Sequence, residues 1–308
     1  MPEIVEVKKY ADFIIKKLKN KYITDIKILN GRYKTHGPFE LYNQFKKKLP
    51  LKLLDVKTKG KFMYIIFENE YYLCVTLGLS GGWMYSNDDN YKKGKYIIPT
   101  FYNRADENQT EAYYDNAMKH LNLQLKAHDG SLFFYDTLSY GTLKIIKGRD
   151  KLCKKLKKLG PDVMDPGFTF DVFKQCIHNL FNRANGKNKL IGNVIMDQTV
   201  ISGLGNYLRA DILWLSRISP FRKISKLSDN ELQHIYKAIK FLTWATYDIK
   251  QGIKLKFVSK NAKLPADYGR NFYVYGEDED MFGNKVKKDK LHDGTQVRYI
   301  HWVPSLQK

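Results

Sequence analysis

Apolar residues near the start of the chain recur with helical spacing. They lie at i, i+4, i+7, i+8 and i+11, which places them on one face of a helix. They are Val7, Ala11, Ile14, Ile15 and Leu18. The pattern predicts an N-terminal amphipathic helix that ends near the lysine-rich segment 16–21.

From about residue 22 to residue 147 the pattern changes to short runs rich in Ile, Val, Tyr and Phe, separated by Gly, Asn and Asp. Such runs are typical of β-strands. The clearest predicted strands are 22–29, 62–68, 71–77 and 131–135. This half of the chain therefore reads as an antiparallel β-sandwich or barrel. The polar segment 87–108 is predicted to be a long surface loop or insertion.

Helical spacing returns after the lysine-rich segment 147–158 and the Leu-Gly-Pro sequence that follows it. Ser228 and Glu231 form a capping box, which marks the start of the longest predicted helix. The predicted helices cover residues 170–180, 190–197, 207–216 and 229–249. Strand-like runs at 272–275 and 296–302, with a turn at 283–284 between them, predict a small C-terminal hairpin.

These patterns predict an α+β fold with three parts. An N-terminal helix and antiparallel β-sandwich occupy 1–147, a helical domain occupies 148–268, and a β-hairpin occupies 269–308. A chain of this length is expected to form more than one core.

Charge suggests the kind of partner. Lys and Arg number 53 and Asp and Glu 32, which gives a formal net charge of +21, while 43% hydrophobic residues leave ample material for buried cores. So large a surplus repels itself unless it meets a polyanion, so nucleic acid or an acidic membrane surface is the expected partner. Most of the cations are Lys, which favours contact with phosphates over base reading.

Several function classes lack their motifs. The 3 cysteines are scattered, which excludes a disulfide framework and a thiolate zinc site and favours a reducing compartment. The 7 histidines form no metal-binding pair motif. The sequence has no apolar stretch of the ~20 residues that a membrane span needs, no secretory signal, no P-loop and no G-x-S-x-G. We therefore expect a soluble intracellular protein without a metal or cofactor.

The first residues suggest a nucleophile. Removal of Met1 before a small residue would expose the secondary amine of Pro2, whose pKa is near ~8, so part of it is unprotonated at neutral pH. Glu3 would lie beside it as a proton donor. Alternatively, Pro2 is the first residue of the helix, and Glu3 and Glu6 complement the helix dipole. These residues alone leave both interpretations open.

A second candidate site lies between two predicted helices at 201–210. Gly203 and Gly205 would let the backbone approach a phosphate closely, Asn206 can donate a hydrogen bond, and the following helix N-terminus attracts an anion. An ordinary helix–helix turn with glycine caps fits the same residues equally well.

Four short motifs occur together along the chain. They are Met-Pro-Glu-x-x-Glu-Val at the start, Lys-Gly-Lys at 59–61, Leu-Gly-Leu-Ser-Gly at 77–81, and Gly-Leu-Gly-Asn-Tyr-Leu-Arg-Ala-Asp-Ile-Leu at 203–213. In this order and at these spacings they resemble the formamidopyrimidine-DNA glycosylase and endonuclease VIII family over nearly the whole chain. Excision of a damaged base requires a grip on DNA phosphates, which would explain the charge.

The resemblance implies specific roles. Pro2 matches the family's nucleophile, which expels the damaged base and leaves a Schiff base, and Glu3 matches the acid that protonates the deoxyribose ring oxygen. Lys61 matches a catalytic lysine that contacts phosphates. Asn206 matches the phosphate-binding asparagine of a helix-two-turn-helix motif. The family's enzymes are glycosylases and apurinic/apyrimidinic lyases, with damaged double-stranded DNA as partner.

Other positions depart from the family pattern. Leu79 stands where a Met usually fills the gap left by the flipped base. The usual Asp-x-Arg-Arg-Phe-Gly loop reads Asp-Thr-Leu-Ser-Tyr-Gly at 136–141, so the Arg that pairs with the orphaned base is missing. Tyr140 in this loop is a candidate DNA contact. The change argues against strict opposite-base selection and against an 8-oxoguanine specialist.

The C-terminal hairpin resembles a zinc finger without its metal ligands. No cysteine follows Cys176, so the resemblance implies the zincless finger of an endonuclease VIII-like branch, held by strand pairing and by packing of Tyr299 and Trp302. Arg298 and Gln296 are the two candidates for its DNA-probing residue.

We therefore expect a monomeric, cofactor-free base-excision repair enzyme that removes oxidised bases, mainly pyrimidines, and nicks the strand by β,δ-elimination. A non-catalytic nucleic-acid-binding protein with the same fold is the main alternative, and Pro2 is the residue that separates the two. A metal-dependent nuclease would need clustered carboxylates, which the sequence lacks. The abundance of Lys, Asn, Ile and Tyr is typical of proteins encoded by AT-rich DNA, as in some protists or large DNA viruses. A nuclear, cytoplasmic or viral location is therefore left open.

Overall fold

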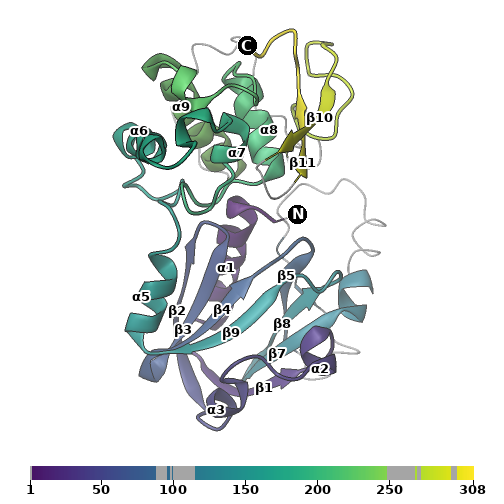
Figure 1. Cartoon of the computed structure of the whole chain (residues 1–308). Coiled ribbons are helices and arrows are strands. Elements are labelled where there is room, and N and C mark those ends of the chain that lie inside the picture. The colour runs from purple at the N-terminus through teal and green to yellow at the C-terminus, as the bar shows by residue number, and fades with distance from the viewer. Residues whose placement is uncertain are drawn as a thin grey trace. The chain divides into compact units, whose positions relative to one another are not determined.

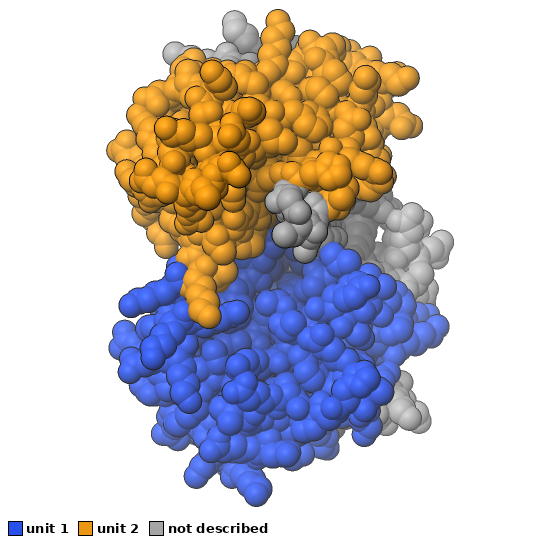
Figure 2. Space-filling view, in the orientation of Figure 1, with its two compact units in different colours: residues 1–2, 6–157 blue, residues 3–5, 158–308 orange. Residues whose placement is uncertain are grey.

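The computed structural model describes residues 2–87, 96–97, 99, 115–247, 268, 272–292 and 297–308. Contacts divide the chain into two compact units, coloured separately in Figure 2. Unit 1 comprises residues 1–2 and 6–157, and unit 2 comprises residues 3–5 and 158–308. In the described part of the chain, no helix is both long and apolar enough to cross a membrane.

Unit 1 is built on one antiparallel sheet (Figure 1). The described strands follow the order β6-β5-β8-β7-β1-β2-β3-β4-β9. The strands are β1 Tyr22–Ile28, β2 Leu51–Lys59, β3 Phe62–Phe67, β4 Tyr71–Thr76, β5 Gly81–Ser86, β6 Tyr96–Ile97, β7 Leu121–Ala127, β8 Gly130–Asp136 and β9 Thr142–Lys147. The helices are α1 Ile4–Leu18, α2 Arg32–Thr35, α3 Tyr42–Lys46 and α5 Arg149–Leu156, and a 3-10 turn, η1, spans Glu68–Glu70.

The core of unit 1 joins the N-terminal helix to both halves of the sheet. Tyr10 and Ile14 of α1 are buried in one cluster with Ile65 of β3 and Leu125 of β7. The apolar stripe therefore packs as its spacing predicts, and the expected antiparallel sheet domain with an N-terminal helix is confirmed. Most of the predicted insertion at 87–108 lies outside the described residues.

Unit 2 is rich in helices and ends in a hairpin. Ser228 caps α9, and its side chain and that of Glu231 make both hydrogen bonds of the predicted capping box. The helices are α6 Phe170–His178, α7 Ile191–Val194, α8 Asn206–Leu215 and α9 Asp229–Thr246, with 3-10 turns η2 Asn179–Asn182, η3 Gly186–Asn188 and η4 Ile224–Lys226. The antiparallel hairpin consists of β10 Lys287–His292 and β11 Val297–Trp302.

Two predictions for unit 2 differ from the structure. The helix predicted at 190–197 ends at Val194, because the following residues turn toward the loop before α8. The strand predicted at 272–275 is wrong. There, the backbone N–H groups of Tyr273, Val274 and Tyr275 donate to the carboxylate of Asp211 on α8 instead of to a neighbouring strand.

Asp211 therefore anchors the segment that leads to the hairpin. Its buried carboxylate also accepts a hydrogen bond of 2.7 Å from the Tyr268 hydroxyl. Burial raises the pKa of Asp211 to about 6, although the bonds from Tyr268 and from the backbone act in the opposite direction. The carboxyl of Asp211 therefore holds its proton up to a higher pH in the folded protein than in the unfolded chain.

This shift predicts a pH dependence of stability. The contribution of Asp211 is fully present below the pKa of an unfolded Asp, about 3.9, and is lost as pH rises through about 6. We expect the stability of the wild type relative to Asp211→Asn to rise by about 1 kcal/mol between pH 6 and pH 5. Chemical denaturation of both proteins at the two pH values measures this difference, and a difference that stays constant or falls would contradict it.

Candidate functional site

Glu3 caps a helix that lies two hundred residues away in the sequence. Its Oε2 accepts a hydrogen bond of 2.5 Å from the Gly205 N–H, and its Oε1 accepts one of 3.0 Å from the Tyr207 N–H. These groups belong to the first turn of α8, which has no side-chain cap from its own N-cap residue. A carboxylate at this position satisfies otherwise unpaired N–H groups and complements the helix dipole.

The glycines before α8 form the docking surface for this N-terminal segment. The Ile4 N–H donates to the Gly203 carbonyl at 3.1 Å. A Cβ at Gly203 would lie 2.4 Å from Cδ1 of Ile4, and the φ of Gly203 is +124°. Gly203 and Gly205 are thus occupied by the chain's own N-terminal segment, and a phosphate clamp formed by their backbone, one of the two sequence interpretations, is not what these glycines do.

Pro2 lies outside the first helix. Helix α1 begins at Ile4, so Pro2 is not its first residue, and that part of the alternative interpretation is wrong, whereas Glu6 lies in the first turn as that interpretation expects. Glu6 is the acidic residue in the first turn of α1 and is buried. Pro2 is half-buried and covalently adjacent to Glu3, whose carboxylate reaches α8.

Lys61 lies at the tip of a tight hairpin in unit 1. Strand β2 ends at Lys59 and β3 begins at Phe62, and these two residues are paired, so Gly60 and Lys61 form the turn. Gly60 has a φ of +57°, a conformation that glycine adopts without strain. The Lys59 Nζ donates to the Leu156 carbonyl at 3.0 Å, so Lys59 holds the hairpin against α5. Lys61 therefore has a fixed backbone position at the end of the hairpin.

Two loops of unit 1 expose apolar side chains. Leu79, in the turn at 77–81, is 43% exposed, and Tyr140, in the loop at 136–141, is 61% exposed. Large apolar side chains at exposed loop tips mark contact surfaces more often than isolated surface residues do. This exposure is what the insertion of Leu79 and Tyr140 into a base stack would require.

The same two loops are joined by a buried carboxylate. The Ser80 Oγ donates to Asp136 Oδ1 at 2.5 Å and accepts from the Leu138 N–H at 2.9 Å. The Gly141 N–H donates to Asp136 Oδ2 at 2.6 Å. These bonds hold the turn at 77–81 and the loop at 136–141 in one arrangement, and sequence reasoning did not assign Ser80 or Asp136 this role.

Asn206, Arg209 and Arg298 come together in unit 2. The Arg209 Nη2 donates to Asn206 Oδ1 at 3.1 Å and to the Tyr299 carbonyl at 2.8 Å, and its Nη1 donates to the Gly192 carbonyl at 3.2 Å. Arg209 is 0% exposed. Burial, and secondarily the charge of Arg298, lowers the pKa of Arg209 to about 10, so the guanidinium stays charged at neutral pH.

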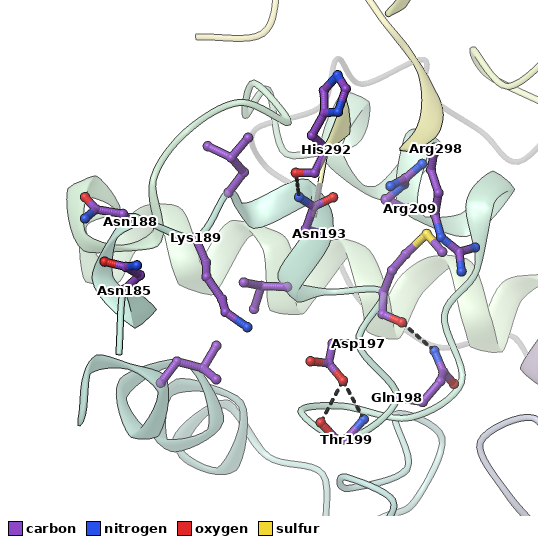
Figure 3. Close-up of a pocket in the computed structure, with 14 residues that line it drawn as sticks. Asn185, Asn188, Lys189, Asn193, Asp197, Gln198, Thr199, Arg209, His292 and Arg298 are labelled. Atoms are coloured by element: carbon purple, nitrogen blue, oxygen red, sulfur yellow. Dashed lines mark hydrogen bonds between the residues drawn. The ribbon is translucent and has the colours of Figure 1, made fainter. Parts of the chain in front are cut away.

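A cavity of about 880 Å³ adjoins this cluster. Its wall includes Arg209 of α8, Arg298 of β11 and Lys189 before α7, together with the amides of Asn193 and Gln198. Figure 3 shows Arg209 and Arg298 beside each other on this wall. The Asn193 Nδ2 donates to the His292 carbonyl at 2.6 Å and so joins α7 to β10. Three cations and one carboxylate, that of Asp197, line the cavity, so the charges of its wall favour an anionic ligand. Gln296, the other finger candidate, lies outside the described residues.

Two carboxylates in and before the C-terminal hairpin accept hydrogen bonds. The Trp302 Nε1 donates to Asp289 Oδ2 at 2.7 Å, so this carboxylate is used across the strands. Asp280, before the hairpin, accepts from Trp214 Nε1 and from the Phe282 and Asn284 N–H groups. Among the described residues, no three His, Cys, Asp or Glu side chains gather at a metal-binding spacing.

The aromatic residues of the hairpin differ in their packing. Trp302 contacts Phe221 edge to face with ring centroids 5.3 Å apart, as expected of a residue that supports the hairpin. Tyr299 is instead 48% exposed, with the Lys288 ammonium 5.1 Å from its ring centroid. The alternation of a strand puts Tyr299 on the outer face, where it packs against Lys288 of the other strand and not in the core.

Sequence comparisons match both units. The model of the formamidopyrimidine-DNA glycosylase N-terminal domain matches residues 1–143, and that of the formamidopyrimidine-DNA glycosylase H2TH domain matches residues 159–256. The formamidopyrimidine-DNA glycosylase of Rickettsia conorii is 28% identical over 282 residues, which cover 90% of this chain and 89% of the relative. The one from Mycoplasma genitalium is 27% identical over 239 residues, which cover 77% and 72%.

Solved structures share the fold. Lactococcus lactis Fpg in complex with DNA containing an abasic site aligns with a TM-score of 0.72 and 21% identity over 100% of both chains. MutM in complex with DNA containing carbocyclic 8-oxo-G aligns with a TM-score of 0.72 and 20% identity over 100% of both chains. With the family models matching most of the chain, it belongs to the formamidopyrimidine-DNA glycosylase and endonuclease VIII family of DNA glycosylases.

Proposed function

We propose that this protein is a bifunctional DNA glycosylase and apurinic/apyrimidinic lyase that excises oxidised bases, mainly pyrimidines, from double-stranded DNA. Its partner is damaged duplex DNA, which the net charge of +21 attracts. It acts as a monomer without a cofactor. We assign it to the endonuclease VIII-like branch with a zincless finger, because no cysteine follows Cys176 in the sequence.

The proposed chemistry begins at Pro2. Its unprotonated secondary amine attacks C1′ of the damaged nucleotide, and the bond from C1′ to the base breaks, with its electron pair leaving on the base. The proton lost from the amine nitrogen ends on the expelled base. Glu3 protonates the deoxyribose ring oxygen, so the sugar opens and the nitrogen of Pro2 and C1′ form an iminium ion. Loss of the C2′ proton then expels the 3′ phosphate, and a second elimination expels the 5′ phosphate. Hydrolysis of the iminium ion frees the enzyme.

One observation carries the proposal. The carboxylate of Glu3 binds the N–H groups of Gly205 and Tyr207, on either side of the DNA-binding candidate Asn206. Folding thus uses the residue next to the proposed nucleophile to cap the helix that carries Asn206. A pure nucleic-acid-binding protein could use the same cap, so Pro2, together with the Gly-Lys hairpin at 60–61, is what separates the two functions.

The preference for pyrimidines rests on the loop at 136–141. It exposes Tyr140 and Leu138 and has no Arg to pair with an orphaned base. Apolar and aromatic side chains stack on any base, so the loop favours no particular opposite base. A related protein, Lactococcus lactis Fpg, has been solved with DNA containing an oxidised pyrimidine, which is consistent with this substrate class. In the family, the loop that corresponds to residues 252–270 folds over the flipped base. Of these residues the structure describes Tyr268 alone.

Borohydride trapping tests the proposal. The protein is incubated with duplexes that carry thymine glycol, an abasic site or no lesion, and borohydride reduces any Schiff base to a stable adduct. We expect adducts on both damaged duplexes and nicked product without borohydride. Binding to both damaged duplexes with no adduct on either would instead identify a non-catalytic DNA-binding protein.

Lys61→Ala is expected to separate catalysis from DNA binding. Loss of one lysine at the hairpin tip should reduce adduct formation about 100-fold or more, because a positioned cation is lost from the reacting phosphates. Binding to undamaged duplex should change less than about threefold, since one surface lysine is one phosphate contact among many. Lys57→Ala on β2, also an exposed lysine, is the control. An equal loss of adduct and of binding would show that Lys61 acts as a phosphate contact alone.

A further inference from the structure

Arg209 is a buried charge that has only neutral hydrogen-bond partners. It is 0% exposed, and its three acceptors are the Asn206 side-chain oxygen and the carbonyls of Tyr299 and Gly192. Its Nε has no hydrogen-bond partner among the described residues. The charge of Glu3 attracts the guanidinium, but all three of its hydrogen-bond acceptors are neutral. A buried guanidinium with neutral acceptors keeps much of its desolvation cost. A function outside folding would account for its presence.

The bond to Asn206 determines which way the amide faces. Arginine has five N–H donors and no acceptor, so the atom of Asn206 that faces Arg209 must be the carbonyl oxygen. The amide nitrogen then points away from Arg209. Asn206 is only half-buried, so its NH₂ group is available as a donor on the outer side of the helix N-terminus.

The bond to Tyr299 holds the neighbouring strand residue. Arg298 directly precedes Tyr299 in β11, and both Arg209 and Arg298 line the cavity (Figure 3). The bond to Gly192 adds α7 to the same cluster. A Cβ at Gly192 would lie 2.8 Å from Cδ2 of Leu291, so α7 and the hairpin are also in close contact. One side chain therefore connects α7, α8 and β11.

We propose that Arg209 is a positioning residue for DNA binding. It orients the NH₂ group of Asn206 and fixes the strand of Arg298, so that two donors from separate elements grip the phosphate backbone together. The proposal rests on the proposed function, because it takes Asn206 and Arg298 as DNA contacts. The repulsion between Arg209 and Arg298 is relieved when a phosphate enters beside them.

The test compares one substitution in two backgrounds. Binding of Arg209→Met is measured on a duplex with a stable abasic-site analogue, in the wild type and in the Asn206→Ala/Arg298→Ala double variant. In the wild-type background we expect affinity to fall about 10- to 100-fold, the range for hydrogen bonds to charged groups. In the double variant we expect Arg209→Met to change the affinity by less than about twofold, because the side chains of Asn206 and Arg298, through which Arg209 acts, are already absent.

Further variants separate positioning from folding and from charge. Arg209→Met removes the donor of the Gly192 and Tyr299 carbonyls, so its melting temperature should fall somewhat, and binding is compared at a temperature where both proteins are fully folded. Arg209→Lys should bind as weakly as Arg209→Met, because a single ammonium cannot reach three acceptors in fixed directions. Arg217→Met, a half-buried arginine of the same unit that stacks on Trp214, should bind like the wild type. Borohydride trapping by Arg209→Met should need about 10- to 100-fold more DNA for half-maximal yield, in line with its loss of affinity.

Specific results would overturn the inference. An equal loss of affinity in both backgrounds, or full affinity for Arg209→Lys, would show that Arg209 does not act by positioning Asn206 and Arg298. If Arg209→Met is unfolded at the temperature of the binding measurement to an extent that explains its lower affinity, Arg209 acts in folding alone. Failure of the wild type to form a borohydride adduct would instead remove the proposed function, which the trapping control detects separately.

Discussion

Blocking the amine of Pro2 is expected to abolish the reaction. When Met1 is replaced by a short extension that stays attached, the nitrogen of Pro2 remains a peptide amide and has no lone pair available for attack. We expect borohydride adducts and base excision to fall by at least about 1,000-fold, the scale seen when an enzyme loses its nucleophile. Binding to a duplex with a stable abasic-site analogue should persist, because the phosphate contacts remain.

The control for this experiment is the same protein after the extension has been removed. A protease site placed directly before Pro2 restores the free amine, and mass spectrometry of the N-terminus verifies it. Activity should return in proportion to the fraction cleaved. Pro2→Gly, which supplies a primary amine, should trap weakly, since a primary amine forms an imine that must be protonated to be equally electrophilic. Undiminished trapping by the extended protein would place the nucleophile elsewhere, on a lysine.

Glu3→Gln is expected to lower the excision rate by more than its loss of stability can explain. Removal of a general acid typically reduces a rate about 10²- to 10⁴-fold. The amide also offers one acceptor where the carboxylate offers two, so either the Gly205 or the Tyr207 N–H loses its partner. Loss of a helix cap costs about 1 kcal/mol, which lowers the melting temperature but leaves the protein folded.

Single-turnover kinetics and thermal unfolding separate these two effects. We expect Glu3→Gln to bind the damaged duplex while its excision rate falls at least about 100-fold. Asp12→Asn, which removes an exposed carboxylate from α1, should behave like the wild type in both measurements. The excision rates of Glu3→Gln and the wild type are also compared at temperatures equally far below their melting temperatures. If the two rates are then equal, Glu3 acts in folding only.

Local patterns were sufficient for most of the elements. The apolar stripe of α1 and the capping box of α9 are made by residues within a few positions of one another, so their spacing reports the helix directly. The tight turn at Gly60 and Lys61 likewise follows from a glycine between two apolar strands. The motif order then indicated the family, which the family models confirm.

The tertiary structure decided how the candidate site is held together. The sequence by itself determined which residues can do chemistry, since Pro2, Glu3 and Asn206 carry the necessary groups. It did not determine that Glu3 caps a helix more than two hundred residues away, or that Arg209 orients Asn206. Nor did it show that Asp211 takes up the N–H groups of a predicted strand. Each of these hydrogen bonds joins groups that are neighbours only after the chain has folded, and no spacing along the sequence records them.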